Sequence, residues 1–582
     1  MSERLVGSAG PILVVDIQAA GPRPEVDHLL EIAAAWYDPV SGRVEEFARR
    51  CRLPKGGELP PRVTALTGWT AADLAGEPEA EEVWRELGRW LQLLPPARLL
   101  VAHYLSYERR FLEYWSDCMA PVLLPEVQVC TWELARRRFP ELPAHTLRAV
   151  AGYVGFVLEE RRRALEHVRA TLAVWRALRE CSRTGTAAED RGASPASRHG
   201  RGFGAETAWD EMPRAPGIYR FLDASGRVLY VGKATDLRSR LRSYFPPGGR
   251  RARGNRIREM VAQVKAVETL PAPSRLEAAL LEFEEIQAHE PPYNQVHRPR
   301  AGRLVWFGDR ELAHWRTLPG EDFPVGPVAV PSALQLAAEL WNWIRGARGA
   351  PAELANWRRE VDGEGAGADL LSALREWAAA CFRPWLAVSS PTVALGILRS
   401  ALLEALSAEE DDGGLDAGEE RGGGEEVEGV VASTPGEAGG ERRESERELA
   451  TLQRALLHAL ARGAEETWRS RWYRRLADAT VCWETAGGSR RFLALRGGRI
   501  VLQGEVSEEP VEMGCGRIPA RGCGRDGEEA AGASAWSETT WRRLGVLTAE
   551  LRRLVREGGA VEVWFQDGTA WDRRRLSHLL GD

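Results

Sequence analysis

The sequence predicts a multidomain α/β protein. Its 582 residues exceed what one hydrophobic core usually holds, so about three or four domains are expected. In the first half of the chain, short β-branched apolar runs alternate with stretches of helical periodicity, which is typical of α/β domains. Two segments of small, polar or acidic residues, at 181–206 and 405–447, divide the chain further.

The first predicted domain spans residues 11–180. The run ILVVD at 12–16 is apolar and β-branched, as expected for a buried strand. The later elements continue the alternation of strands and helices: LLEIAAAWYDP and SGRVEEFARRCRLP as strands around a turn at 39–42, a helix at 80–94, a strand at 97–103 and a terminal helix at 156–181. Residues 181–206 are rich in glycine and serine, so we expect a flexible linker there.

The second predicted domain spans residues 209–300. Two strand-like runs, GIYRFLD and VLYVGKA, are joined by the turn signal ASGR, which predicts a β-hairpin. The elements that follow are a helix at 234–245, a helix from Arg256, a strand at 264–270 and a helix at 274–290 that ends before two prolines. This order predicts a short antiparallel sheet with helices packed on it.

The rest of the chain is divided by composition. Residues 301–404 form an α-rich region of unknown role, and residues 448–582 form a mixed α/β region of unknown role. Residues 405–447 between them are acidic, glycine-rich and almost free of aromatic residues. Such a segment cannot bury enough apolar surface to offset the entropy of ordering, so we predict a disordered acidic linker.

Charge and composition favour a nucleic-acid partner and disfavour a membrane. Residues 213–300 hold sixteen Lys/Arg against nine Asp/Glu, although the whole chain has a net charge of −6. A local basic patch in an acidic protein predicts a polyanion-binding surface, with a solvated arginine-rich face as the alternative. No apolar stretch approaches the ~20 residues needed to span a bilayer, and no secretory signal is evident. We therefore expect a cytoplasmic protein.

Two rare residue types are informative. The eight cysteines are scattered without a CxxC pair, so neither a zinc ribbon nor a dense disulfide framework is predicted. Only three lysines occur in the chain: Lys55, Lys233 and Lys265. Lys233 lies inside YVGKA, and lysine differs from arginine where a compact point charge is required. A chemical role for Lys233 is the hypothesis that follows.

Residues 11–178 resemble the DnaQ-type exonuclease family, which has a ribonuclease-H-like fold. The matching features are VVD in the first strand, LLEIAAA in the second, VTALTGWTAADLAGEPEAEEVW, and VAH followed by FL. The resemblance implies four acidic residues that hold two metal ions and a histidine that acts as the base. Two neighbouring divalent metals need several carboxylates to neutralise them and to fix their geometry.

The catalytic letters of that family are largely replaced in this chain. Its DxE pair falls on Asp16 and Gln18, its AHNxxFD motif ends on Glu108, and its HRAxxD motif falls on Arg162-Arg163-Ala164-Leu165-Glu166-His167. An amide supplies no negative charge, and a guanidinium cannot accept a proton near neutral pH. We therefore predict that the exonuclease fold is retained without its activity.

Two alternatives remain open for this domain. One is an unusual or single-metal site built from Asp16, Glu108 and His167. The other is a scaffold or docking domain that still holds DNA, in which Arg162 and Arg163 bind a phosphate directly.

Residues 213–297 resemble the GIY-YIG endonucleases of the UvrC/Cho type. Tyr219 lies in GIY, Tyr230 and Lys233 lie in YVGK, and Asn294 closes PPYN. Three further residues follow the family order: Arg240, Tyr244 and Glu282. A three-letter motif alone would be weak, but this ordered set over about eighty residues is specific. The resemblance implies a small α/β domain that hydrolyses phosphodiester bonds.

The resemblance also assigns roles to these residues. Glu282 is the expected ligand of one Mg²⁺ or Mn²⁺ ion, which would stabilise the departing 3′ oxygen. Tyr219 is the expected general base; its phenol, with an ordinary pKa of about 10, needs nearby positive charge from Lys233 or Arg240. Arg240 would also stabilise the phosphoryl charge, and the remaining members orient or brace the site: Tyr230, Tyr244 and Asn294. DNA contacts are predicted for four arginines: Arg238, Arg242, Arg251 and Arg256.

Each of these residues also has a purely structural interpretation. The tyrosines on paired strands could be cross-strand packing, and Glu282 could be one of several carboxylates on a helix surface. Taken together, the sequence predicts a DNA repair endonuclease that acts on damaged or branched duplex DNA, with a UvrB-like damage-recognition partner. The alternatives are a 3′–5′ DNA exonuclease with an atypical site and a non-catalytic DNA-binding or scaffold protein.

Overall fold

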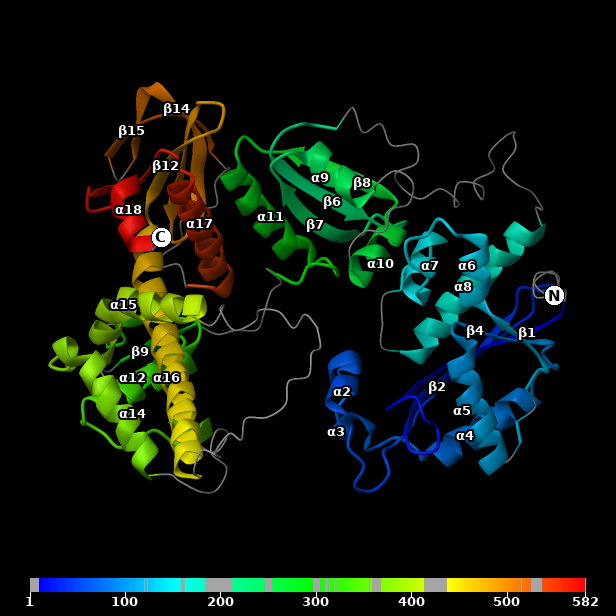
Figure 1. The fold of residues 1–582 in the computed structure, drawn as a ribbon. Coiled ribbons are helices and arrows are strands. Elements are labelled where there is room, and N and C mark those ends of the chain that lie inside the picture. Colours follow the sequence, from blue (N-terminus) through cyan, green and yellow to red (C-terminus); the bar gives the residue numbers. More distant parts are fainter. Residues whose placement is uncertain are drawn as a thin grey trace, which may run out of the picture. The chain divides into compact units, whose positions relative to one another are not determined.

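The computed structural model divides the chain into two compact units, Met1–Arg298 and Pro299–Asp582. Figure 1 shows their elements. The residues that the structure describes are 10–119, 121–122, 124–158, 163–183, 212–245, 254–296, 304–308, 312, 314–318, 320, 322–354, 356–357, 368–412, 437–513, 516–524 and 536–580.

A mixed five-stranded sheet forms the centre of the first domain, with the strand order β3-β2-β1-β4-β5 (Figure 1). Its strands are β1 (Ile12–Ala19), β2 (Leu29–Tyr37), β3 (Val44–Arg50), β4 (Leu99–Ala102) and β5 (Val127–Cys130). β1 runs antiparallel to β2 and parallel to β4. This arrangement confirms the predicted α/β fold with strands preceding helices.

Both faces of this sheet are covered by helices, which explains why its central strands are apolar at successive positions. Leu13 and Val15 of β1 pack with Val83 and Phe111 on one face, whereas Val14 packs with α8 on the other. The helices are α2 (Pro61–Thr67), α3 (Ala71–Leu74), α4 (Ala80–Gln92), α5 (Leu105–Cys118), α6 (Thr131–Arg138), α7 (Leu147–Tyr153) and α8 (Ala164–Arg183). The predicted terminal helix thus begins later than expected, at Ala164.

The second domain is a three-stranded antiparallel sheet with the order β7-β6-β8. Its elements are β6 (Gly217–Leu222), β7 (Val228–Ala234), α9 (Leu237–Tyr244), α10 (Asn255–Gln263), β8 (Ala266–Pro271) and α11 (Arg275–His289). Two helices begin at side-chain caps: Asp236 accepts from the Ser239 amide, and Ser274 accepts from the Glu277 amide. These elements confirm the predicted hairpin and helices.

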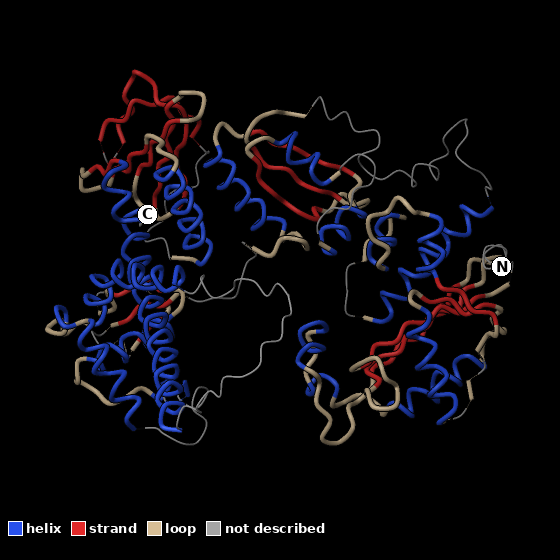
Figure 2. The backbone as a smooth tube through the Cα atoms, in the orientation of Figure 1, coloured by secondary structure: helices blue, strands red, loops and turns tan. Residues whose placement is uncertain are grey.

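The two faces of this small sheet carry different helices (Figures 1 and 2). Tyr219 and Phe221 of β6 pack with Leu237 and Leu241 of α9 and with α10. Val231 of β7 packs with Ile286 of α11 on the opposite face. The edge strand β7 is therefore a place where side chains from the two faces can meet.

The second unit contains two further sheets and several long helices. The three-stranded sheet β10-β9-β11 and the six-stranded sheet β15-β14-β13-β12-β16-β17 are both antiparallel where their registers are given. The strands are β9 (Val305–Phe307), β10 (Trp315–Arg316), β11 (Val325–Val328), β12 (Thr480–Glu484), β13 (Arg490–Arg496), β14 (Arg499–Met513), β15 (Gly516–Gly524), β16 (Val561–Trp564) and β17 (Ala570–Asp572). The helices are α12 (Pro331–Ile344), α14 (Ala368–Cys381), the 3₁₀ turn Arg383–Trp385, α15 (Pro391–Asp412), α16 (Glu437–Leu476), α17 (Glu538–Arg556) and α18 (Arg573–Leu580).

The regions 301–404 and 448–582, which the sequence analysis separated, share one unit. One apolar core runs from Val305 to Ala464 and includes side chains of α12, α15 and α16. At its other end α16 packs on α17, where the Trp472 indole N–H donates to the Thr548 hydroxyl at 2.9 Å. A single long helix therefore joins both regions, and composition could not reveal this because it depends on contacts between distant segments.

Helices extend into both ends of the acidic linker predicted at 405–447. α15 continues to Asp412 and α16 begins at Glu437, so both ends of the predicted linker are helical. Alanine, leucine and glutamate are strong helix formers, which favours extension of α15 through ALLEALSAEE. Residues 413–436 lie outside the described part of the chain, as does most of the predicted linker at 181–206. None of the described helices combines the length and apolar character required to cross a membrane.

Candidate nuclease sites

The strands β6 and β7 bring two of the predicted tyrosines together. Tyr219 is opposite Gly232 in the strand register, and the Tyr219 and Tyr230 rings lie 6.0 Å apart. A Cβ atom added to Gly232 would lie 2.5 Å from the Tyr219 hydroxyl and 2.8 Å from the Tyr230 ring. Only glycine therefore allows the Tyr219 hydroxyl to reach the edge strand, which gives the third letter of YVG a physical reason.

A hydrogen-bonded cluster surrounds the Tyr219 hydroxyl. Its oxygen lies 3.0 Å from the Tyr244 hydroxyl. Arg240 of α9 donates to both, from Nε to Tyr219 at 3.3 Å and from Nη2 to Tyr244 at 3.0 Å. The Arg240 guanidinium also lies over the Tyr244 ring at 5.0 Å. Three residues that are separated by up to 25 positions in the sequence thus converge on one point.

The protonation state of Tyr219 follows from its burial. The ring is fully buried, and this burial raises the pKa of the Tyr219 phenol far above its ordinary value, with the neighbouring tyrosines acting in the same direction. Arg240 opposes this shift. Burial likewise raises the pKa of Tyr230. The expected lowering of the Tyr219 pKa is therefore absent in this state, and Tyr219 is a neutral phenol.

Glu282 reaches the same edge strand from α11. Its Oε1 accepts the Lys233 backbone N–H at 3.0 Å, and its Oε2 lies 3.5 Å from the Lys233 ammonium. The Glu282 carboxylate is close enough to Tyr230 to contribute to the raised pKa of that phenol. The carboxylate is thus one residue along β7 from Gly232, beside the tyrosine cluster, and its side chain keeps 14% of its surface exposed.

Asn294 has a defined bracing role. Its side-chain oxygen accepts the Val231 N–H at 2.9 Å, and its side-chain nitrogen donates to the Val231 carbonyl at 2.8 Å. Asn294 is buried, and the two bonds act like a short additional strand on the open edge of β7. Because Val231 lies between Tyr230 and Gly232, Asn294 fixes the strand segment that carries the site.

The four arginines predicted to bind DNA differ in their contacts. Arg238 donates to the Met212 carbonyl at 2.8 Å, and Arg256 donates to the Pro292 carbonyl at 3.1 Å, so both contribute to packing within the domain. Arg242 is exposed on α9 beside Arg240. Arg251 lies outside the described residues. The DNA-binding assignment of all four stays a prediction.

The residues near Glu282 suit one hydrated divalent ion and not a caged one. Within the described ranges, no group of three or more His, Cys, Asp or Glu side chains is arranged to hold a metal. Mg²⁺ is commonly held by one or two carboxylates, with water and substrate oxygens completing its shell. Glu282, partly exposed and beside a cluster of hydroxyl and guanidinium donors, fits that requirement.

The exonuclease-fold domain gathers its remnant residues at the end of β1. Gln18 donates to Asp16 Oδ2 at 2.9 Å and lies 3.3 Å from His167 Nδ1. His167 Nδ1 lies 3.3 Å from Asp16 Oδ1. The amide and the imidazole thus occupy both oxygens of Asp16. The structure thus brings these three positions together, and the group lacks the several carboxylates that two metals need.

Glu108 is the third remnant carboxylate and is sealed inside the domain. It is buried, and its Oε2 has no hydrogen-bond partner within the described residues. Burial raises the pKa of the Glu108 carboxyl well above its ordinary value, with the charge of Asp16 acting in the same direction. Burial therefore favours the neutral form of Glu108, and a neutral carboxyl is a poor metal ligand.

Arg163, one of the two arginines of the last motif, has a structural partner. Its Nε lies 3.2 Å from Oε1 of the buried Glu31, and the Ala164 N–H donates to Glu31 Oε2 at 2.8 Å. The pair anchors the start of α8 on β2. Arg162, the residue at the position of the family's base, lies outside the described residues.

Several contacts that the sequence analysis did not foresee link α7 of the first domain to the second. The Lys265 ammonium donates to the Tyr153 carbonyl at 2.6 Å and lies 4.7 Å from the Tyr153 ring. Glu259 accepts from Thr146 at 3.1 Å and from the Tyr293 hydroxyl at 2.7 Å. The rarity of lysine was the one signal in the sequence that singled out Lys265.

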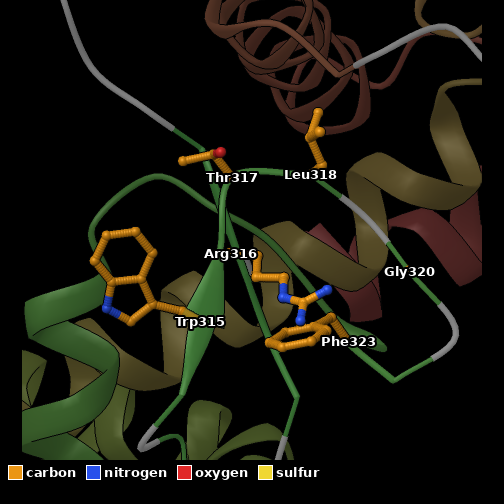
Figure 3. Close-up of a pocket in the computed structure, with 6 residues that line it drawn as sticks. All are labelled: Trp315, Arg316, Thr317, Leu318, Gly320 and Phe323. Carbon is orange, nitrogen blue, oxygen red and sulfur yellow. The ribbon is translucent and has the colours of Figure 1, made fainter.

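The second unit has a surface cavity of about 500 Å³, which Figure 3 shows. Its lining residues are Trp315, Arg316, Thr317, Leu318, Gly320 and Phe323. The Arg316 guanidinium lies over the Phe323 ring at 4.6 Å, and Trp315 is 49% exposed. Among the described residues of this lining there is no carboxylate, histidine or thiol.

Sequence comparison assigns both N-terminal domains to families. Residues 13–175 match the exonuclease family, and residues 215–295 match the UvrC-like GIY-YIG domain. A Mycobacterium tuberculosis protein whose name describes it as a bifunctional exonuclease/endonuclease is 34% identical over 278 residues. That match covers 46% of this chain and 39% of the relative. UvrABC system protein C of Sphingopyxis alaskensis is 47% identical over 88 residues, which are 15% of this chain and 13% of the relative.

Among solved structures, the GIY-YIG N-terminal endonuclease domain of UvrC from Thermotoga maritima, bound to its catalytic magnesium ion, is 32% identical. The match covers 14% of this chain and 88% of the Thermotoga maritima chain, with a TM-score of 0.13. This chain spans less than half the length of each of the two sequence relatives. The chain carries an exonuclease-family domain followed by a UvrC-like GIY-YIG endonuclease domain, in the order predicted from the sequence.

Proposed function

We propose that this protein is a cytoplasmic DNA repair endonuclease of the UvrC/Cho type. Its substrate is damaged or branched duplex DNA, and a UvrB-like protein is the partner that locates the lesion. The observation that carries the proposal is the convergence of Tyr219, Tyr244 and Arg240 beside Gly232, with Glu282 one residue along the same strand. These groups are the base, the phosphate-binding cation and the metal ligand that phosphodiester hydrolysis requires.

The proposed reaction is direct attack of water on the phosphorus atom. The water oxygen forms a bond to phosphorus while the bond from phosphorus to the 3′ oxygen breaks. Tyr219, a neutral phenol at rest, first loses its proton to solvent. The resulting phenolate oxygen accepts the proton of the attacking water, and the departing oxygen keeps the bond electrons and takes a proton from solvent. Arg240 favours the phenolate form of Tyr219 and pairs with the phosphoryl oxygens as their charge increases.

The other residues of the site hold these groups in place. Tyr244 fixes the Tyr219 hydroxyl from α9, at 3.0 Å. Asn294 keeps the edge of β7 extended, and Lys233 holds the Glu282 carboxylate through its backbone N–H and its ammonium. A Mg²⁺ or Mn²⁺ ion bound by Glu282 would polarise the phosphate and stabilise the departing oxygen.

The first domain contributes no catalysis in this proposal. Gln18 and His167 contact both oxygens of Asp16, and burial raises the pKa of the Glu108 carboxyl. To bind there, a pair of metal ions would have to displace Gln18 and His167 from Asp16 and bind the ionised form of Glu108. The two activities in the name of the Mycobacterium tuberculosis relative make exonuclease activity the alternative to be tested.

A nicking assay with supercoiled plasmid and lesion-containing duplex, in Mg²⁺ or Mn²⁺, tests the proposal. Wild-type protein is expected to nick, and Glu282→Gln is expected to lower the rate by at least roughly a hundredfold, because the amide is a weaker ligand of a divalent ion. Glu284→Gln, on the same helix, is the matched control and is expected to nick normally. Failure of wild-type protein to cut under either metal would overturn the proposal.

The same samples decide between the alternatives. An exonuclease would shorten labelled 3′ ends and lose that activity in Asp16→Ala, whereas the proposal predicts no shortening by wild-type protein. A non-catalytic binding protein would cut neither substrate and would bind DNA with an affinity that falls steeply with salt.

A further inference from the structure

We infer that the exonuclease-fold domain is a positioning element for the GIY-YIG site, acting through the contact of α7 with α10 and Tyr293. The inference rests on the proposed endonuclease function for its kinetic consequences, but its structural basis is independent of that function. It assigns a role to a domain whose own catalytic residues are replaced.

The contact is close and specific. Gly152 of α7 lies against the side chain of Gln263, and a Cβ atom added to Gly152 would lie 2.3 Å from Gln263 Cγ. Ala262 of α10 belongs to the same apolar core as Val150 and Ala151 of α7. A glycine inside a helix normally weakens it, and here the missing side chain is what lets the two helices approach.

Polar contacts at this junction converge on one aromatic residue. The Tyr293 hydroxyl donates to Glu259 Oε1 at 2.7 Å and accepts from Gln263 Nε2 at 2.6 Å. The other Glu259 oxygen accepts from Thr146 of the first domain at 3.1 Å. The Arg148 guanidinium, also from the first domain, lies 5.3 Å from the Tyr293 ring centre. Tyr293 is therefore held from both domains and is buried.

Tyr293 connects directly to the catalytic strand. Its backbone N–H donates to the Leu229 carbonyl at 3.1 Å, and its neighbour Asn294 makes both side-chain hydrogen bonds to Val231. Leu229 and Val231 flank Tyr230, and Gly232 and Lys233 follow. The path from α7 to the site thus consists of a few hydrogen-bonded residues, of which Tyr293 and Asn294 are buried.

Gly152→Ala in the full-length chain tests the inference. Within α7 alone this change would stabilise the helix, so the collision with Gln263 is its main effect. Gly88→Ala in α4 is the matched control, because an added Cβ there meets only Val122 at 3.6 Å. We expect Gly152→Ala to lower kcat for nicking roughly tenfold with KM unchanged, and Gly88→Ala to behave as wild type.

A second variant approaches the same contact from the endonuclease side. Tyr293→Phe removes the hydrogen bonds to Glu259 and Gln263 and keeps the ring. Its effect on kcat is expected to be similar. The loss of kcat in the double variant, Gly152→Ala with Tyr293→Phe, is expected to be smaller than the product of the two single losses, because both changes act on one path. Multiplicative effects would overturn the inference.

Hydrogen exchange provides a measurement that does not depend on activity. Peptides covering β7 are expected to exchange faster in Gly152→Ala than in wild type or Gly88→Ala, because the Val231 amide loses its fixed partner. Unchanged exchange of β7 in Gly152→Ala overturns the inference even if nicking by that variant is slowed. If wild-type protein does not nick while β7 exchange increases in Gly152→Ala, the proposed function fails and the positioning role stands.

Discussion

Two sites in the same unit use carboxylates in opposite ways. In the exonuclease-fold domain, Gln18 and His167 contact Asp16, and the neighbouring Glu108 is buried, with one oxygen that has no hydrogen-bond partner in the described part of the chain. In the GIY-YIG domain, Glu282 remains partly exposed and is oriented by the backbone and side chain of Lys233. The first arrangement neutralises its charges internally, whereas the second keeps one charge oriented beside a cluster of donors.

The difference shows how many substitutions each kind of site can tolerate. A two-metal site needs several carboxylates at once, so an amide and a histidine at two of its positions remove two expected ligands. Burial also raises the pKa of the remaining carboxyl of Glu108. A one-metal site depends on a single carboxylate and on neutral or cationic donors around it. The comparison can be tested by substitutions that remove the proposed catalytic groups of the second site or add carboxylates to the first.

The largest effect is expected for Tyr219→Phe. Removing the hydroxyl deletes the proposed base, and such groups contribute roughly 10²- to 10⁴-fold to rates. Because burial raises the pKa of Tyr219, the phenolate fraction and hence kcat of wild-type protein should rise about tenfold per pH unit between about pH 7 and 9. Rates of plasmid nicking across this range give the slope, and the slope should vanish in Tyr219→Phe.

The control for that experiment comes from the other domain. Tyr107→Phe removes a tyrosine hydroxyl that donates to the Gly21 carbonyl at 3.3 Å, next to Glu108. Nicking should keep its wild-type rate and pH slope in this variant. A flat profile for wild-type protein would show that Tyr219 does not act as a phenolate base.

Arg240→Ala is expected to lower kcat by roughly 10²-fold, because it removes the cation that favours the Tyr219 phenolate and pairs with the phosphoryl oxygens. Arg227→Ala, at the exposed turn between β6 and β7, changes the net charge of the same domain equally and should leave kcat unchanged. Steady-state nicking rates of both variants decide the point. Equal losses in the two would reduce the role of Arg240 to general charge attraction.

Gln18→Glu combined with His167→Asp should move the first site toward a metal site. The two changes surround Asp16 and Glu108 with additional negative charge, which only a cation can offset. In a Glu282→Gln background, Mn²⁺ titration calorimetry should show binding that the unchanged first domain lacks. Saturating Mn²⁺ should stabilise the variant by roughly 2–3 kcal/mol at a hundredfold excess over Kd. Absence of binding would mean that the backbone, and not only these side chains, has departed from a metal-binding geometry.

The sequence was sufficient where chemistry lies in local motifs. The tyrosines, Arg240 and Glu282 could be assigned because hairpin and helix signals place them on defined elements, and the structure brings them together. The replacements at Gln18 and His167 could likewise be identified from their letters. The direction of the pKa shift of Tyr219 could not be predicted from the sequence, because the shift depends on burial of the ring against α9, which is a tertiary property.

Contacts between distant segments were beyond the sequence. The apposition of Gly152 and Gln263, and the hydrogen bonds around Tyr293, join residues more than a hundred positions apart or on different elements. Lys265 was visible only as a rare residue type, and its partner, the Tyr153 carbonyl, has no side-chain signature. The extent of α15 was also missed, because composition alone does not show that Ala405 and Leu406 pack against the core of the second unit.

The smallest expected effect concerns Glu108, which differs from Glu282 in being sealed from solvent. Its folded-state pKa is raised by burial, so its contribution to stability is fully present below the ordinary glutamate pKa of about 4.3 and is lost as pH rises through the folded-state pKa. Glu108→Gln removes this ionisation. The variant should match wild type near pH 4 and be more stable by roughly 1 kcal/mol near pH 8, as measured by thermal unfolding. Glu113→Gln, exposed on the same helix, should shift neither value. A destabilised Glu108→Gln variant at pH 8 would mean that the ionised carboxylate has a cationic partner. The site of the exonuclease-fold domain would then resemble the Glu282 site more than its geometry indicates.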